Sequence, residues 1–173
     1  VTGPACVDPA SEVVQVIAAA LRDAFDAEGP CGAPEGGGTT TVRFFATDGG
    51  VIWDQGCKQP HVWVRVDRRY RSRVEQFPAA FVGDDPCGTG VMRVLAVEVG
   101  VARCSSADAA PKWDKLSREA EISLDDSWRI ETALCGAVKR LRREDRAVAS
   151  DTIAPVGPEG GMMAWTGMVY AQL

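Results

Sequence analysis

The stretch Val91–Arg103, VMRVLAVEVGVAR, decides the fold class because it is the most strand-like run in the chain. Almost all of its residues are apolar, and valine dominates. An uninterrupted apolar run of this kind predicts a central strand covered on both faces. The flanking sequence must therefore supply the strands that pair with it and the helices that cover it.

Strand patterns lie on both sides of this run. Residues 61–73 alternate, with Val62, Val64 and Val66 on one face and His61, Trp63, Arg65 and Asp67 on the other. Residues 39–46 (TTTVRFFA) also have strand chemistry, and 51–53 form a short apolar segment. Residues 163–173 predict a C-terminal strand, preceded by a tight loop at 157–161 in which Gly160 and Gly161 require positive φ.

Two helices are expected to cover the sheet. Residues 9–27 carry apolar side chains at three- and four-residue spacing, which predicts an amphipathic helix. A second helical stripe runs from 113 to 146, in one kinked helix or two in series, because Asp125–Asp126 can also start a new helix. Its expected inner face is Leu116, Ala120, Leu124, Trp128, Leu134, Val138 and Leu141.

This order predicts a single α+β domain over residues 1–173. We expect a mainly antiparallel sheet of about five strands, with the N-terminal helix and the long helix of the C-terminal half packed on one face. Residues 29–38 hold five glycines and two prolines, which predicts a loop. We expect this loop, or an extended hairpin, to become ordered only in an assembly.

Composition narrows the function classes. The chain has 173 residues and a formal net charge of −5, which argues against a general polyanion binder. No apolar run is long enough to span a membrane, and the first residues lack the basic and apolar pattern of a signal peptide. We therefore expect a soluble cytoplasmic domain with no membrane partner.

The sequence predicts no catalytic site, no metal site and no cofactor. His61 is the only histidine, and no GxSxG or P-loop pattern occurs. Since His61 opens a strand beside Pro60, we expect an edge or surface imidazole. The six cysteines form no CxxC pair, so we expect free, mostly buried thiols rather than zinc ligands. A Cys–His dyad stays open as an alternative.

Two basic segments stand out in an acidic chain. Residues 61–73 carry five arginines against one aspartate, and residues 139–146 carry five cations against two carboxylates. They can be solvated faces, subunit or partner contacts, or nucleic-acid contacts. We predict a subunit or partner interface, made of Arg65, Arg68, Arg69, Arg71, Arg73, Lys139, Arg142, Arg143 and Arg146.

Several segments resemble the tail terminator, or head-to-tail connector, proteins of long-tailed phages that infect actinobacteria. They are Cys57–Arg73 (CKQPHVWVRVDRRYRSR) with Phe77–Pro78, Val94–Cys104 (VLAVEVGVARC), Asp125–Asp126 in a helix, and Gly157–Val169 (GPEGGMMAWTGMV). The resemblance spans roughly residues 50–173. The scarcity of lysine and the lack of asparagine agree with a GC-rich genome.

The resemblance implies a structural virion protein and no enzyme. It implies a ring, typically of six subunits, that caps the tail tube, ends its polymerisation and joins it to the head-completion (stopper) protein. Phage DNA would pass through the lumen without sequence-specific binding. The protein would lie at the neck of the virion, after assembly in the host cytoplasm. The alternatives are a stopper, an adaptor or another minor tail protein, a small metal-binding or regulatory module, and a small cytoplasmic thiol hydrolase.

Overall fold

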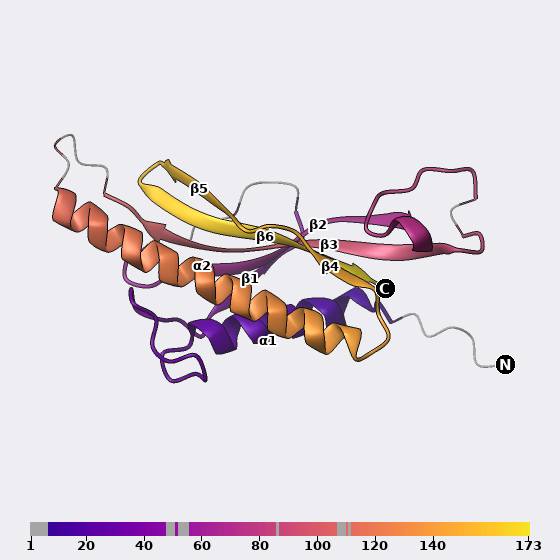
Figure 1. The fold of residues 1–173 in the computed structure, drawn as a ribbon, viewed down its shortest axis with the longest axis horizontal. Helices are drawn as coiled ribbons and strands as arrows, with labels where there is room; N and C mark the ends of the chain where they lie inside the picture. The colour runs from indigo at the N-terminus through magenta and orange to yellow at the C-terminus, as the bar shows by residue number, and fades with distance from the viewer. Residues whose placement is uncertain (1–6, 48–50, 52–55, 86, 107–109, 111) are drawn as a thin grey trace.

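A computed structural model describes residues 7–47, 51, 56–85, 87–106, 110 and 112–173. The chain forms two layers, a sheet and a pair of α-helices that both lie on one side of it (Figure 1). In chain order the elements are α1 (Ala10–Phe25), β1 (Val42–Phe45), β2 (His61–Arg73), a 3₁₀ turn (Val74–Gln76), β3 (Val91–Cys104), α2 (Trp113–Arg142), β4 (Val148–Ser150), β5 (Ala154–Glu159) and β6 (Met162–Gln172).

The sheet confirms the predicted α+β class, with six strands where about five were expected. Its order is β1-β2-β3-β6-β4, and β5 pairs with β6. Every pairing is antiparallel except that of β1 with β2. As predicted, β3 is central, and its residues Val94 to Val97 are fully buried on both faces.

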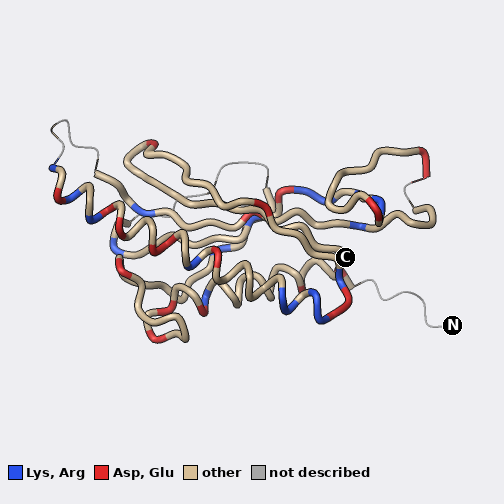
Figure 2. The backbone as a smooth tube through the Cα atoms, in the orientation of Figure 1, with Lys and Arg blue, Asp and Glu red and all other residues tan. Residues whose placement is uncertain are grey.

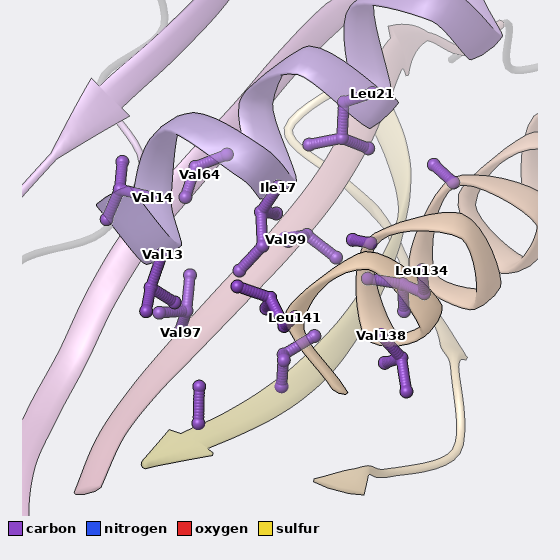
Figure 3. Packing of buried hydrophobic residues seen from close by; sticks show 14 of the residues in the cluster. Val13, Val14, Ile17, Leu21, Val64, Val97, Val99, Leu134, Val138 and Leu141 are labelled. Atoms are coloured by element: carbon purple, nitrogen blue, oxygen red, sulfur yellow. The ribbon is translucent and has the colours of Figure 1, made fainter. Parts of the chain in front are cut away.

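The core lies between the sheet and the helices (Figure 3). The apolar spacing of α1 places Val13, Ile17 and Leu21 on one buried face, because residues three and four apart share a side of a helix. This face packs on β2 and β3 and against the second half of α2. Burial of each such side chain stabilises the fold by about 1.5–3 kcal/mol.

The long helix α2 is one continuous helix and not two helices in series. Asp125 and Asp126 start no new helix, because their carboxylates accept hydrogen bonds from Arg129 and Arg103 instead. The second half of α2 covers the sheet with Leu134, Val138 and other small apolar residues. None of the described helices is apolar enough over a sufficient length to cross a membrane.

The prediction of a loop over residues 157–161 is wrong in part. Strand β5 continues to Glu159, and the turn consists of Gly160 and Gly161, whose φ values of 59° and 77° confirm the predicted positive φ. Every residue of β5 is exposed. The segment therefore lacks the alternation of apolar and polar residues that would predict a strand from the sequence.

Strands β2 and β3 continue past the helices as a hairpin arm, which we define as residues 67–92 (Figure 1). Their pairing reaches Arg73 opposite Val91, beyond a bulge between Val66 and Arg68. The Tyr70 hydroxyl donates to the carbonyl of Pro78 at 2.6 Å, which ties the connecting loop back onto β2.

Candidate interaction surfaces

The sheet face that points away from the helices carries a polar cluster. Arg65 donates to both carboxylate oxygens of Glu98, from Nε at 3.2 Å and from Nη2 at 2.7 Å. Trp63 Nε1 donates to the same carboxylate at 3.1 Å. The Arg65 and Glu98 side chains are only 18% exposed, so Arg65, a predicted interface residue, is largely occupied within the chain.

An apolar groove of about 550 Å³ lies beside this cluster. Its lining residues come from the four strands β2, β3, β5 and β6 and include Trp63, Val156, Met162, Met163 and Ala164. The sequence gives no signal for the groove, because it forms only where β5 pairs with β6 next to β2 and β3.

Two predicted interface arginines bind the acidic start of α1. Arg69 pairs with both carboxylate oxygens of Asp8, and Arg146 pairs with Glu12 and, at 3.2 Å, with Glu144. The hydrogen bonds from Arg69 lower the pKa of Asp8 below its ordinary value. These two arginines therefore have a structural role in the single chain.

Three further predicted residues lie on the arm. Arg68 is exposed, 3.6 Å from Asp67, and its guanidinium stacks over the ring of Tyr70. Arg73 lies 4.5 Å from the centroid of the Phe81 ring, and Arg71 is half-buried. The arm thus presents two cations, Arg68 and Arg73, whose guanidinium groups lie over aromatic rings.

The last predicted residues gather at the C-terminal end of α2 (Figure 2). Lys139, Arg142 and Arg143 are all exposed there, and Arg142 donates to the carbonyl of Val148 at 3.0 Å. Cations at a helix C-terminus are favoured by the helix dipole. The structure places the nine predicted residues in four groups: the sheet face that points away from the helices, the start of α1, the arm, and this helix end. Their role in subunit contacts stays a prediction.

The expected inner face of α2 is wrong at Ala120, Leu124 and Trp128, and Ala120 is exposed. The Leu124 and Trp128 side chains are exposed, by 65% and 66%, and so is Trp113, by 75%. Successive steps of four residues rotate by about 40° around a helix, so the four-residue series drifts off the buried side. Spacings of 11 and 4 instead place these three residues on one outer side, which we call the α2 stripe.

The glycine-rich loop 29–38 is bound to α2 by Arg129. The Arg129 guanidinium is buried, and it donates to the carbonyls of Ala24, Gly32 and Ala33 at 2.7–3.0 Å. Its Nε binds Asp125 at 2.8 Å, and Asp125 also accepts from the Glu35 N–H at 3.0 Å. The single chain already holds this loop, so the expectation that it becomes ordered only in an assembly is wrong.

A second set of contacts, made by Arg103, joins the same loop to the end of β3. Arg103 binds both carboxylate oxygens of Asp126 at 2.6 and 2.8 Å, and donates to the carbonyls of Gly36 and Gly37. Burial raises the pKa of Asp126 above its ordinary value, against the opposing effect of Arg103. The acidic pair is visible in the sequence, but a helix start was the role predicted for it, because its arginine partner in β3 is distant along the chain.

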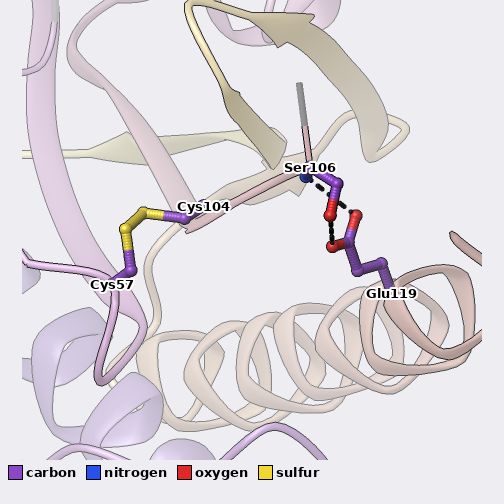
Figure 4. The surroundings of a disulfide bond; sticks show 4 residues. All are labelled: Cys57, Cys104, Ser106 and Glu119. Carbon is purple, nitrogen blue, oxygen red and sulfur yellow. Dashed lines mark hydrogen bonds between the residues drawn. A yellow bond between two sulfur atoms is a disulfide. The ribbon is translucent and has the colours of Figure 1, made fainter. Parts of the chain in front are cut away.

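The cysteine prediction is wrong. Cys57 and Cys104 form a disulfide that joins the segment before β2 to the end of β3 (Figure 4). Cys31, Cys87 and Cys135 are free but exposed, not buried, and Cys6 lies outside the described residues. Close to the disulfide, the Glu119 carboxylate accepts hydrogen bonds from the backbone and hydroxyl of Ser106, which fixes the exit from β3 against α2 (Figure 4).

His61 is buried, 3% exposed, in a strand that lies between β1 and β3, so the expected edge or surface imidazole is wrong. The nearby Cys57 is in the disulfide and is not a thiol in this structure. Across the part of the chain that the structure describes, no three His, Cys, Asp or Glu side chains gather as ligands for a metal ion.

Comparison with known proteins identifies no relative. No protein-family model matches this chain, and no curated protein sequence matches it either.

Proposed function

We propose that this chain is the tail terminator of a long-tailed phage with an actinobacterial host. In this role six copies form a ring that caps the tail tube and ends its polymerisation. The ring joins the tail to the head-completion protein, and DNA passes through its lumen. The protein is assembled in the host cytoplasm and resides at the neck of the virion.

One observation carries the proposal: the separate segments that resemble this family lie together in space. They form the neighbouring strands β2, β3 and β6, with β5 paired to β6. The acidic pair of α2 joins them through the Arg103–Asp126 contact at the end of β3. Scattered similarities that fold into one contiguous body support a shared architecture better than the same similarities spread over unrelated surfaces.

The two-layer architecture adds support. The resemblance implies a sheet with helices packed on it, and this chain has both α-helices on one side of its sheet (Figure 1). Among the described residues, an apolar groove, a projecting arm and the α2 stripe are exposed surfaces that the contacts of a ring would cover.

The proposal is tested with the purified chain in two assays. Native mass spectrometry and negative-stain images should show closed rings at micromolar concentration. Added to polymerising tail-tube protein, the chain should shorten the tubes and appear at one end of each. An unrelated protein of similar mass and charge serves as the control. A chain that stays monomeric and leaves tube length unchanged overturns the proposal.

A further inference from the structure

The disulfide between Cys57 and Cys104 joins an exposed residue to a half-buried one. Cys57 lies in the irregular segment before β2, whereas Cys104 is the last residue of β3 (Figure 4). The Cα atoms of the two residues are 5.4 Å apart, a usual separation for a disulfide. Disulfides open and form when a thiolate attacks one of the two sulfur atoms, so the exposed residue is the one that a small thiol in solution reaches.

Cys57 lines an open pocket of about 330 Å³. This volume falls within the range of small-molecule pockets, about 300–1,000 Å³. Arg43 of β1 and Lys58, the residue after Cys57, also line the pocket. None of the described residues that line it is a carboxylate, so the pocket attracts an anionic molecule in preference to a cationic one.

Cys104 is fixed by its neighbours in the sheet. It pairs with Met162 of β6, and the Ser105 N–H donates to the carbonyl of Gly161 at 2.7 Å. These contacts do not include the disulfide, so Cys104 stays at the end of β3 when the bond opens. Its thiol therefore remains close to Cys57, where it can displace a small molecule attached to that residue.

We propose that Cys57 is a site of thiol–disulfide exchange with small thiols that carry carboxylates, and that Cys104 is the resolving thiol. A thiolate from solution attacks the Sγ atom of Cys57, a mixed disulfide forms there, and the sulfur of Cys104 leaves as a thiolate. A second small thiol attacks the mixed disulfide, frees Cys57 and yields the small-molecule disulfide. The protein gains two electrons and two protons, which the two small thiols lose.

The reverse sequence closes the bond, with the small-molecule disulfide as the oxidant. The surroundings set the direction, because a reducing cytoplasm favours the open form and an oxidising environment favours the closed form. This inference goes beyond the proposed function and does not require a ring. In the proposed role, the chain is assembled with two thiols and closes its disulfide in the released virion.

The first test follows the opening of the disulfide in the purified, folded wild type. The probe is reduced glutathione, a thiol with two carboxylates, and alkylation followed by peptide mass spectrometry identifies each cysteine that has reacted. The opening rate should rise in proportion to the glutathione concentration, because the thiol reaches Cys57 without unfolding. A rate that levels off at the unfolding rate would overturn the proposal, since only the unfolded chain would then react.

The second test separates the two cysteines. With glutathione disulfide, the reduced Cys104→Ser variant should accumulate a mixed disulfide at Cys57, because the resolving thiol is gone. In the matched Cys57→Ser variant, the half-buried Cys104 should react more slowly, while the exposed Cys135 gives an internal reference in both. Circular dichroism checks that both variants fold, and the wild-type measurement decides the proposal if either does not. Faster reaction at Cys104 would overturn the assigned roles.

The third test addresses the charge of the thiol. Lys58→Glu should slow the opening by glutathione about three- to tenfold at low salt, and leave the rate with the neutral thiol mercaptoethanol nearly unchanged. The control is Arg140→Glu, which reverses an exposed cation near the C-terminal end of α2 and should change neither rate. An equal change with both thiols, or none with glutathione, would overturn the preference for carboxylates. None of these results depends on ring formation, so the exchange can fail while the proposed function stands.

Discussion

Asp125 shows how one side chain holds an irregular segment in place. Its carboxylate accepts from the Glu35 N–H and from Arg129, whose guanidinium in turn binds three backbone carbonyls. Burial alone raises the pKa of Asp125, but these hydrogen bonds and the charges of Arg129 and Arg103 outweigh it and lower that pKa. A carboxyl with a lowered pKa stabilises the fold when it is ionised.

Asp125→Asn should therefore lower the free energy of unfolding at pH 7, by about 2–3 kcal/mol, because Arg129 stays buried without its carboxylate. The wild type has this stabilisation above the unfolded pKa, about 4, and loses it as the pH falls through the lower folded pKa. Denaturant titrations from pH 7 to pH 3 should show the two proteins converging. The exposed Asp23→Asn is the control, and an effect independent of pH would contradict the ion-pair explanation.

Gly100 and Gly136 offer a matched pair of glycine substitutions. A Cβ at Gly100 would lie 2.1 Å from Trp63 Cζ2, so alanine must displace the indole that binds Glu98. Gly100→Ala should destabilise the fold by about 1–3 kcal/mol. A Cβ at Gly136 meets no atom within 4 Å, so Gly136→Ala in α2 should stabilise by about 0.5–1 kcal/mol. Thermal unfolding of both variants checks the two signs, and a stabilising Gly100→Ala would contradict this packing.

At the scale of elements, the disulfide links the segment before β2 to the end of β3. The two cysteines are 47 residues apart in the sequence. A cross-link over such a loop restricts the unfolded chain and stabilises the fold by about 4 kcal/mol in the chain-entropy model. In a reducing cytoplasm the two thiols stay reduced, so this stabilisation belongs to the protein in an oxidising environment.

Cys57→Ser with Cys104→Ser should lower the thermal midpoint without reductant and match the reduced wild type in its presence. Cys31→Ser, which removes an exposed free thiol, should change neither value. Differential scanning calorimetry with and without a thiol reductant makes the comparison. Equal midpoints for wild type and double variant under oxidising conditions would contradict a stabilising role.

At the scale of the whole molecule, the two ends of α2 carry different side chains. Its first two thirds carry exposed apolar residues and charges of both signs, whereas basic residues gather at its C-terminal end, where the tube is blue in Figure 2. A contact between such ends combines apolar area, which salt hardly weakens, with exposed charges, which salt screens over about 10 Å at 0.1 M.

Raising NaCl from 0.05 to 0.5 M should therefore weaken self-association of the wild type several-fold without abolishing it. The Lys139→Glu, Arg143→Glu variant should lack this salt dependence or show the opposite one, because it reverses two exposed cations of the predicted interface. Sedimentation velocity at several salt concentrations measures both. Association that salt does not change would contradict a role for these charges.

Local patterns in the sequence were sufficient to predict most of the helices and strands. The alternation of Val62, Val64 and Val66 predicted β2 over residues 61–73, and the structure has the same bounds. The apolar spacing of Val13, Ile17 and Leu21 predicted the buried face of α1. In both cases the signal is a period of two or 3.6 residues, which neighbouring positions carry by themselves.

Patterns failed where the outcome depended on distant residues. Arg69 meets Asp8 and Arg146 meets Glu12, pairs that lie 61 and 134 residues apart. The burial of His61 depends on the parallel pairing of β1 with β2.

The sequence by itself determined the class of the fold, its central strand and its two helices, because local apolar periodicity sets which face of each element is buried. Only the tertiary structure decided which cations are bound within the chain and which remain exposed, and which cysteines pair. These depend on contacts between residues far apart in the chain, and a local pattern holds no information about the distant partner.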